Sequence, residues 1–195
     1  IGENTLWAVV CDGMGGHAAG EVASSIAVET IAKTAPQSAD AARLAAAVEA
    51  ANAAVIEAAL NGLGKPGMGC TATCAYIEND TLAIAHVGDS RAYLLHEGTL
   101  IRVTRDHSYV EELVDAGEIT ADEARVHPNR SVITRALGSD PAMYADHFTL
   151  HIEEGDRLIL CSDGLSSMIP DSDIENIATQ SSTAQICVDN LVDAA

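Results

Sequence analysis

Three apolar runs in this chain end in the same way, with an aspartate beside a glycine. Val9-Val10-Cys11 leads into Asp12-Gly13, Ala85-His86-Val87 leads into Gly88-Asp89, and Leu160-Cys161-Ser162 leads into Asp163-Gly164. Short apolar runs that are rich in β-branched residues predict buried strands. If these strands lie in facing sheets, their three carboxylates converge at one edge, and this requirement restricts the folds that the chain can adopt.

Three carboxylates that meet without compensation repel one another, and a hard divalent cation bound by oxygen ligands is the simplest relief. The sequence has no cysteine or histidine set at zinc-ligand spacing, which favours Mg²⁺ or Mn²⁺ over Zn²⁺. Asp-Gly and Gly-Asp are also common turn signals, so any one pair on its own reads more readily as a turn. Three pairs at the ends of buried strands favour the metal interpretation.

The rest of the chain alternates between helical and strand-like periodicity. The helical segments that we expect are 21–35, 40–60, 171–179 and 183–194. Strands are expected at 71–77 and 81–87, joined by a turn at Asn79-Asp80, then at 92–95, 100–103, 148–152 and 157–162. Because the segment 81–87 is apolar on both faces, it should lie inside a sandwich of sheets.

Residues 106–130 differ in kind, being polar and helix-prone only in short pieces, 109–116 and 121–125. Such an insertion is typical of a flap that lies over the surface and contacts substrate. His107 is expected to anchor this flap by side-chain hydrogen bonds. His86, inside an apolar strand, is expected to be a satisfied core residue. His17 follows Asp12 across the glycine-rich turn and is a candidate general acid.

Composition limits the partners and the location of the chain. Its 195 residues carry a formal net charge of −19, which argues against nucleic acid or an anionic membrane as a partner, because phosphates would be repelled. No apolar run approaches the length of a membrane span and no signal segment is evident, so we expect a cytoplasmic protein. The five cysteines are scattered and embedded in apolar runs, which predicts reduced core residues. One packed domain over 1–195 is the simplest organisation.

Six ordered motifs together resemble the bacterial branch of the type 2C metal-dependent protein phosphatases. They are Val9–His17 (VVCDGMGGH), Gly69–Thr73 (GCTAT), His86–Arg91 (HVGDSR), Thr104–Ser108 (TRDHS), Thr134–Gly138 (TRALG) and Leu160–Leu165 (LCSDGL). The resemblance implies an α+β fold, a four-layer αββα sandwich of two antiparallel β-sheets flanked by helices.

The same resemblance implies a binuclear Mn²⁺ or Mg²⁺ centre, with a third ion in bacterial members. Asp12 would bridge both metals, the Gly13 carbonyl would bind one, Asp163 the other, and Asp89 the third, weaker ion. His17 would correspond to the general acid. The implied reaction is hydrolysis of phosphoserine or phosphothreonine in proteins by a metal-activated water, and the implied partners are phosphorylated proteins and a cognate Ser/Thr kinase.

The chain also departs from the family pattern. Family members have an earlier strand with a phosphate-gripping arginine and a closing Asp-Asn pair before a final strand. Asp189-Asn190 could match that pair, although a solvated helix face explains it as well. From these departures we expect a domain incomplete at both ends, weakened metal binding, low activity, and association through exposed sheet edges.

Two other functions compete with the phosphatase interpretation. A catalytically weak or inactive pseudophosphatase that binds phosphoproteins is the main alternative. Another two-metal hydrolase such as a nuclease is disfavoured by the acidic surface and the 3% aromatic content.

Overall fold

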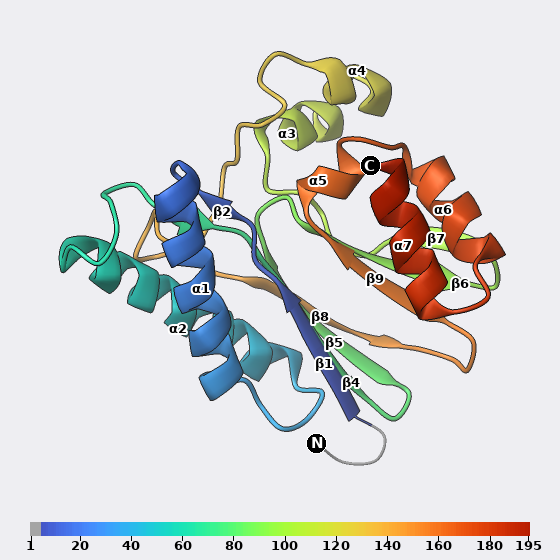
Figure 1. Cartoon of the computed structure of the whole chain (residues 1–195), viewed down its shortest axis with the longest axis horizontal. Coiled ribbons are helices and arrows are strands. Elements are labelled where there is room, and N and C mark those ends of the chain that lie inside the picture. Colours follow the sequence, from blue (N-terminus) through green and yellow to red (C-terminus); the bar gives the residue numbers. More distant parts are fainter. Residues whose placement is uncertain (1–4) are drawn as a thin grey trace.

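Two antiparallel sheets lie face to face between two helical layers in the computed structural model, which describes residues 5–195 (Figure 1). The first sheet has the order β1 (Thr5–Val10), β4 (Ala72–Glu78), β5 (Thr81–Val87) and β8 (Asp146–His151). The second has the order β7 (Thr99–Arg102), β6 (Arg91–His96) and β9 (Arg157–Cys161). A two-residue pair joins β2 (Gly13–Met14) to β3 (Gly69–Cys70). The expected αββα sandwich is confirmed.

The helices cover the outer faces of the two sheets. The first sheet is covered by α1 (His17–Thr34) and α2 (Ala41–Leu60), and the second by α6 (Asp171–Gln180) and α7 (Ala184–Ala194) (Figure 1). Three shorter helices lie above one end of the sandwich: α3 (Tyr109–Asp115), α4 (Ala121–Val126) and α5 (Asp163–Ser166). Among the described residues, no helix combines the length and apolarity needed to cross a bilayer.

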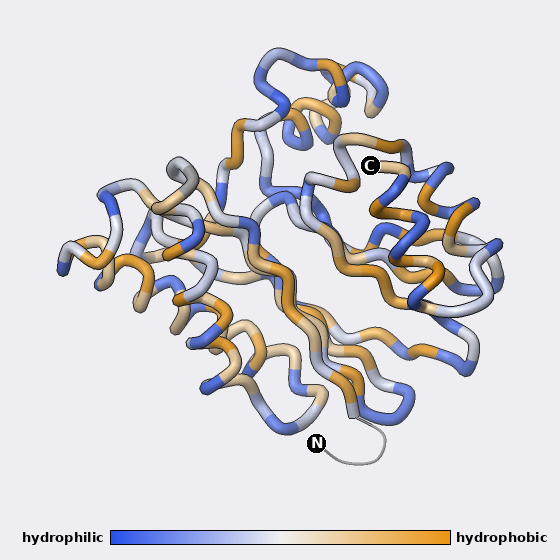
Figure 2. Tube along the Cα trace, viewed as in Figure 1, coloured by the Kyte–Doolittle hydropathy of each residue, from blue (hydrophilic) through white to orange (hydrophobic). Residues whose placement is uncertain are grey.

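Three apolar interfaces lie between the four layers. They form because successive side chains along each strand point to opposite faces of the sheet. In β5, Ala83, Ala85 and Val87 face α1 and α2, whereas Leu82 and Ile84 face the second sheet. Successive strand residues point to opposite faces, so a strand in this position must be apolar throughout, as expected. The third interface joins β6 and β9 to α6 and α7. The hydropathy-coloured trace shows the same apolar strands at the centre (Figure 2).

Two local expectations need correction. The first helix begins at His17, about one turn before the expected Glu21, because Gly20 is accommodated in the helix where its backbone packs on Gly13. A Cβ added at Gly13 would lie 2.1 Å from the Gly20 carbonyl oxygen, so only glycines permit this approach. The strand expected at 157–162 ends at Cys161, because Ser162 is already the N-terminal boundary of α5, which begins at Asp163.

Candidate metal centre

Asp12 lies just after the end of β1, and hydrogen bonds to Thr71 hold both its backbone N–H and its backbone carbonyl. Its N–H donates to Thr71 Oγ1 at 2.9 Å, and its carbonyl accepts from the Thr71 N–H at 2.9 Å. Thr71 Oγ1 also lies 2.7 Å from Ser90 Oγ, next to Asp89. One threonine therefore connects the loop that carries Asp12 to the loop that carries Asp89.

The loop before Asp89 is held from the other side by the flap. The Gly88 N–H donates to His107 Nδ1 at 3.0 Å, and the Gly88 carbonyl accepts from the His107 N–H at 2.7 Å. The remaining ring nitrogen of His107 then donates to Asp146 Oδ2 at 3.0 Å. His107 is 2% exposed, and its expected role as an anchor of the flap is confirmed.

His86 is also confirmed as a satisfied core residue. Its Nδ1 lies 2.9 Å from Thr73 Oγ1, and its Nε2 lies 3.0 Å from the carbonyl oxygen of Arg105. Burial lowers the pKa of His86 to about 4, and the neighbouring His107 contributes to this shift. A ring that stays neutral at physiological pH and points into the core has no part in proton transfer to a substrate.

The structure brings the three predicted carboxylates together. Burial raises the pKa of Asp12, and a carboxyl–carboxyl hydrogen bond and charge repulsion from Asp163 add to the effect. Burial, with the negative charges of Asp163 and Asp106, raises the pKa of Asp89 to about 6. Asp12 and Asp89 thus lie in surroundings that disfavour their negative charge, and a bound cation would offset this effect.

The oxygen atoms of these carboxylates suit a hard cation, although the side chains do not form a complete ligand group. Among the described residues, no three His, Cys, Asp or Glu side chains form a ready ligand group. Mg²⁺ and Mn²⁺ commonly use one or two carboxylates and complete their shells with waters and substrate oxygens, which fits the pair Asp12 and Asp163. The Gly13 carbonyl lies against Gly20 in the first turn of α1. The ligand roles of Asp12, Gly13, Asp89 and Asp163 stay predictions.

Two other sequence-based predictions have different outcomes. His17 begins α1, but its side chain lies outside the described part of the structure, so its role as general acid stays a prediction. Asp189 lies within α7 and accepts a hydrogen bond from Gln185 Nε2 at 2.8 Å. The helix interpretation of Asp189-Asn190 therefore accounts for this pair.

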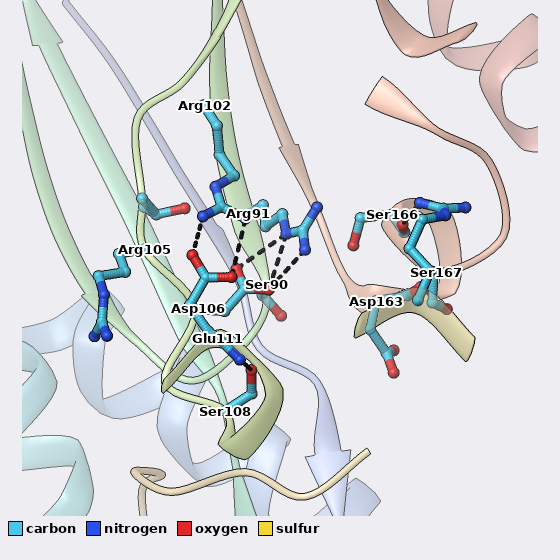
Figure 3. Close-up of polar contacts among 12 residues, drawn as sticks. Ser90, Arg91, Arg102, Arg105, Asp106, Ser108, Glu111, Asp163, Ser166 and Ser167 are labelled. Carbon is cyan, nitrogen blue, oxygen red and sulfur yellow. Dashed lines mark hydrogen bonds and ion pairs between the residues drawn. The ribbon is translucent and has the colours of Figure 1, made fainter. Parts of the chain in front are cut away.

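A cavity of about 370 Å³ opens beside the carboxylates, between the flap and α5. Its lining includes Asp89 and Asp163 together with residues from β6, β7, α3, α4 and the loop before α6. Figure 3 shows Arg91, Arg102 and Asp106 on one side and Asp163, Ser166 and Ser167 on the other. The cavity therefore joins the candidate metal centre to the flap.

Sequence reasoning missed the ion pair that forms one wall of this cavity. Arg91 Nε donates to both carboxylate oxygens of Asp106, at 2.9 and 3.0 Å, and Arg91 Nη2 donates to Asp106 Oδ2 at 2.7 Å. Arg91 Nη1 also donates to Tyr93 Oη, which in turn donates to Asp171. Both residues stood in quoted motifs, but only the fold brings the two motifs into contact.

The chain matches the family model described as Protein phosphatase 2C over residues 5–195. It is 38% identical over 182 residues to the serine/threonine phosphatase stp of Listeria welshimeri, covering 90% of this chain and 72% of that protein. It is 43% identical over 171 residues to the serine/threonine protein phosphatase PstP of Mycobacterium tuberculosis, covering 85% of this chain and 32% of that protein.

Solved structures agree with this match. The crystal structure of the M. tuberculosis phosphatase PstP/Ppp has a TM-score of 0.89 and 38% identity, covering 100% of this chain and 82% of that one. The catalytic domain of PstP in complex with two manganese ions has a TM-score of 0.84 and 34% identity, covering 100% and 83%.

Proposed function

The chain belongs to the protein phosphatase 2C family and is accordingly a serine/threonine phosphatase, and we propose that it hydrolyses phosphoserine and phosphothreonine in proteins at a binuclear Mn²⁺ or Mg²⁺ centre. The observation that carries the proposal is the convergence of three carboxyl groups: Asp89 and Asp163 line one cavity, and Asp163 raises the pKa of both Asp12 and Asp89. The similar PstP domain with two manganese ions supports the metal identity.

Each proposed residue has a separate task. Asp12 and Asp163 would hold the two cations with help from the Gly13 carbonyl, and Asp89 would hold a third. The cations, when bound, supply the charge that acidifies an attacking water. His17 would protonate the serine or threonine oxygen as it leaves. Thr71 and His107 hold the loops of Asp12 and Asp89 in place through the hydrogen bonds described above.

The substrates proposed for the chain are phosphorylated proteins, among them a cognate Ser/Thr kinase, and a cytoplasmic location stays the prediction drawn from the sequence. The alternative, a pseudophosphatase that binds phosphoproteins without turnover, differs from the main proposal in one measurable property. It binds a phosphopeptide but releases no phosphate.

Hydrolysis of p-nitrophenyl phosphate separates the two. With Mn²⁺ we expect turnover that EDTA removes and that Asp12→Asn reduces to the rate of the metal-free reaction. The matched control is Asp80→Asn, which removes an exposed carboxylate from the turn between β4 and β5 and should leave the rate unchanged. Phosphopeptide binding without phosphate release in Mn²⁺ would favour the pseudophosphatase.

A further inference from the structure

The cavity between the flap and α5 gathers positive charge in a strongly acidic protein. The chain has ten Lys and Arg residues against 29 Asp and Glu, yet four of the ten line this one cavity, together with six carboxylates. They are Arg91, Arg102, Arg125 and Arg130. Because the molecule as a whole repels anions, a local cationic surface is where an anionic segment can be held.

Two of the four arginines are neutralised within the cavity wall. Arg91 is paired with Asp106, and Arg102 is paired with Glu111. Asp171, also in the lining, accepts from Tyr93 and lies 3.5 Å from Arg91. This part of the wall has two guanidinium groups and three carboxylates, so it offers an anionic ligand no free positive charge.

The other two arginines keep their charge. Arg125 Nη1 donates to the carbonyl oxygens of Ser166 and Ile169, at 3.2 and 3.4 Å, and neither acceptor is an anion. Arg130 is exposed and has no hydrogen bond or ion pair from its side chain within residues 5–195. Asp122 is the acidic lining residue on the same helix as Arg125, and it is exposed. The flap side of the cavity thus has an excess of positive charge, opposite the carboxylates of Asp89 and Asp163.

The geometry relates this positive charge to the reacting phosphate. Ser166, whose carbonyl binds Arg125, is three residues after Asp163 in α5, a rise of about 5 Å. An extended peptide advances about 3.3 Å per residue. A side chain about two or three residues from the phosphorylated one would therefore reach Arg125 while the phosphate lies at the carboxylates.

We propose that this cavity binds a second anionic side chain of the substrate, two or three residues from the scissile phosphoserine or phosphothreonine, through Arg125 and Arg130. The inference rests on the proposed function and names its substrate class: phosphoprotein segments with a neighbouring carboxylate or a second phosphate. Both groups present the anionic oxygen acceptors that guanidinium donors bind.

The test uses phosphothreonine peptides that differ at one flanking position, tested on each side of the phosphothreonine. The flanking residue is Gln, Glu, or a non-hydrolysable phosphonate analogue of phosphoserine. With the Mn²⁺-loaded protein we expect kcat/KM to rise about three- to tenfold from Gln to the anionic residues, and the rise to shrink with added salt. A rise for the phosphonate alone would identify phosphate as the ligand, and an equal rise for Glu would identify charge.

Arg130→Glu reverses a charge that has no partner among residues 5–195, so this variant should fold normally. We expect the ratio of the rates for the anionic and Gln peptides to fall to about one or below in this variant. Lys65→Glu is the matched control, since it makes the same charge change at an exposed site outside the cavity, between α2 and β3, and should keep the wild-type ratio. Equal rates for all three peptides in the wild type, or an equal loss in both variants, would overturn the inference.

A failure of the proposed function gives a different result. If neither p-nitrophenyl phosphate nor the Gln peptide is hydrolysed, the phosphatase proposal fails, and fluorescence anisotropy of labelled peptides then decides the inference. Tighter binding of the phosphonate peptide than of the Gln peptide, lost in Arg130→Glu and kept in Lys65→Glu, supports the cavity as an anion site. Equal binding of the two peptides rejects it.

Discussion

Gly88 shows how strongly one residue can be constrained by a loop beside the candidate metal centre. Its φ of +107° is one that residues with a Cβ rarely adopt, and an added Cβ would lie 2.6 Å from Thr71 Cβ. Thr71 cannot move aside, because its hydroxyl binds the Asp12 N–H and Ser90. The glycine beside Asp89 is therefore a steric requirement of the Asp12–Asp89 link.

Gly88→Ala should lower the free energy of unfolding by about 3 kcal/mol, the sum of backbone strain and overpacking. Urea unfolding measures the change. Gly62→Ala is the matched control: its φ is +78° and no heavy atom of the described residues lies within 4 Å of the added Cβ, so strain alone should cost about 1 kcal/mol. If both variants lost the same free energy of unfolding, the contact with Thr71 would make no contribution to stability.

His86 gives a pH dependence whose sign follows from its lowered pKa. The unfolded ring titrates near 6.5 and the folded ring near 4, so the unfolded state binds more protons between these values. Stability is fully present above the unfolded pKa and is lost as pH falls toward 4, by an amount on the order of 3 kcal/mol. The lowered pKa of the adjacent His107 acts in the same direction.

His86→Gln should therefore flatten the fall of stability between pH 7 and 4, relative to wild type, in urea unfolding measured at several pH values. His147→Gln removes an exposed histidine of β8 and should leave the wild-type profile unchanged. Parallel profiles for wild type and His86→Gln would mean that the buried ring is protonated in the folded state.

At the scale of elements, β1 is an edge of its sheet in the described structure, with β4 as its ladder partner. Edge strands offer unpaired backbone groups to other chains, and Leu6 of β1 is 54% exposed. The predicted association through sheet edges can therefore be tested at β1.

We expect concentration-dependent association in light scattering, reduced by Leu6→Lys, because a charged side chain on an edge strand opposes pairing. Val192→Lys is the control, since Val192 is 69% exposed and lies on the helix α7 rather than on a strand. A monomeric wild type at high concentration, or an equal effect of both variants, would contradict association through β1.

At the scale of the whole molecule, the candidate metal centre couples both sheets, since Asp12 follows a strand of one and Asp163 follows a strand of the other. A cation that binds both should stabilise the packed sandwich. At about a hundredfold excess over its Kd, Mn²⁺ should add about 3 kcal/mol to the free energy of unfolding.

Thermal unfolding at constant ionic strength measures this effect without any substrate. We expect the midpoint to rise with Mn²⁺ in wild type and in Asp80→Asn, and to stay unchanged in Asp12→Asn. A rise of equal size in Asp12→Asn would place the stabilising ion elsewhere among the 29 acidic residues.

The sequence by itself determined the strands and helices, the burial of β5 on both faces, and the three carboxylates at strand ends. Periodicity and glycine placement are local signals that predict single elements and their buried faces, whereas the four-layer order was implied by the family resemblance of the six motifs. Only the tertiary structure decided the pairing of Arg91 with Asp106, the Thr71 link, and the cavity lined by Arg125 and Arg130. Those contacts join side chains from separate segments, and their distances depend on packing that no local pattern specifies.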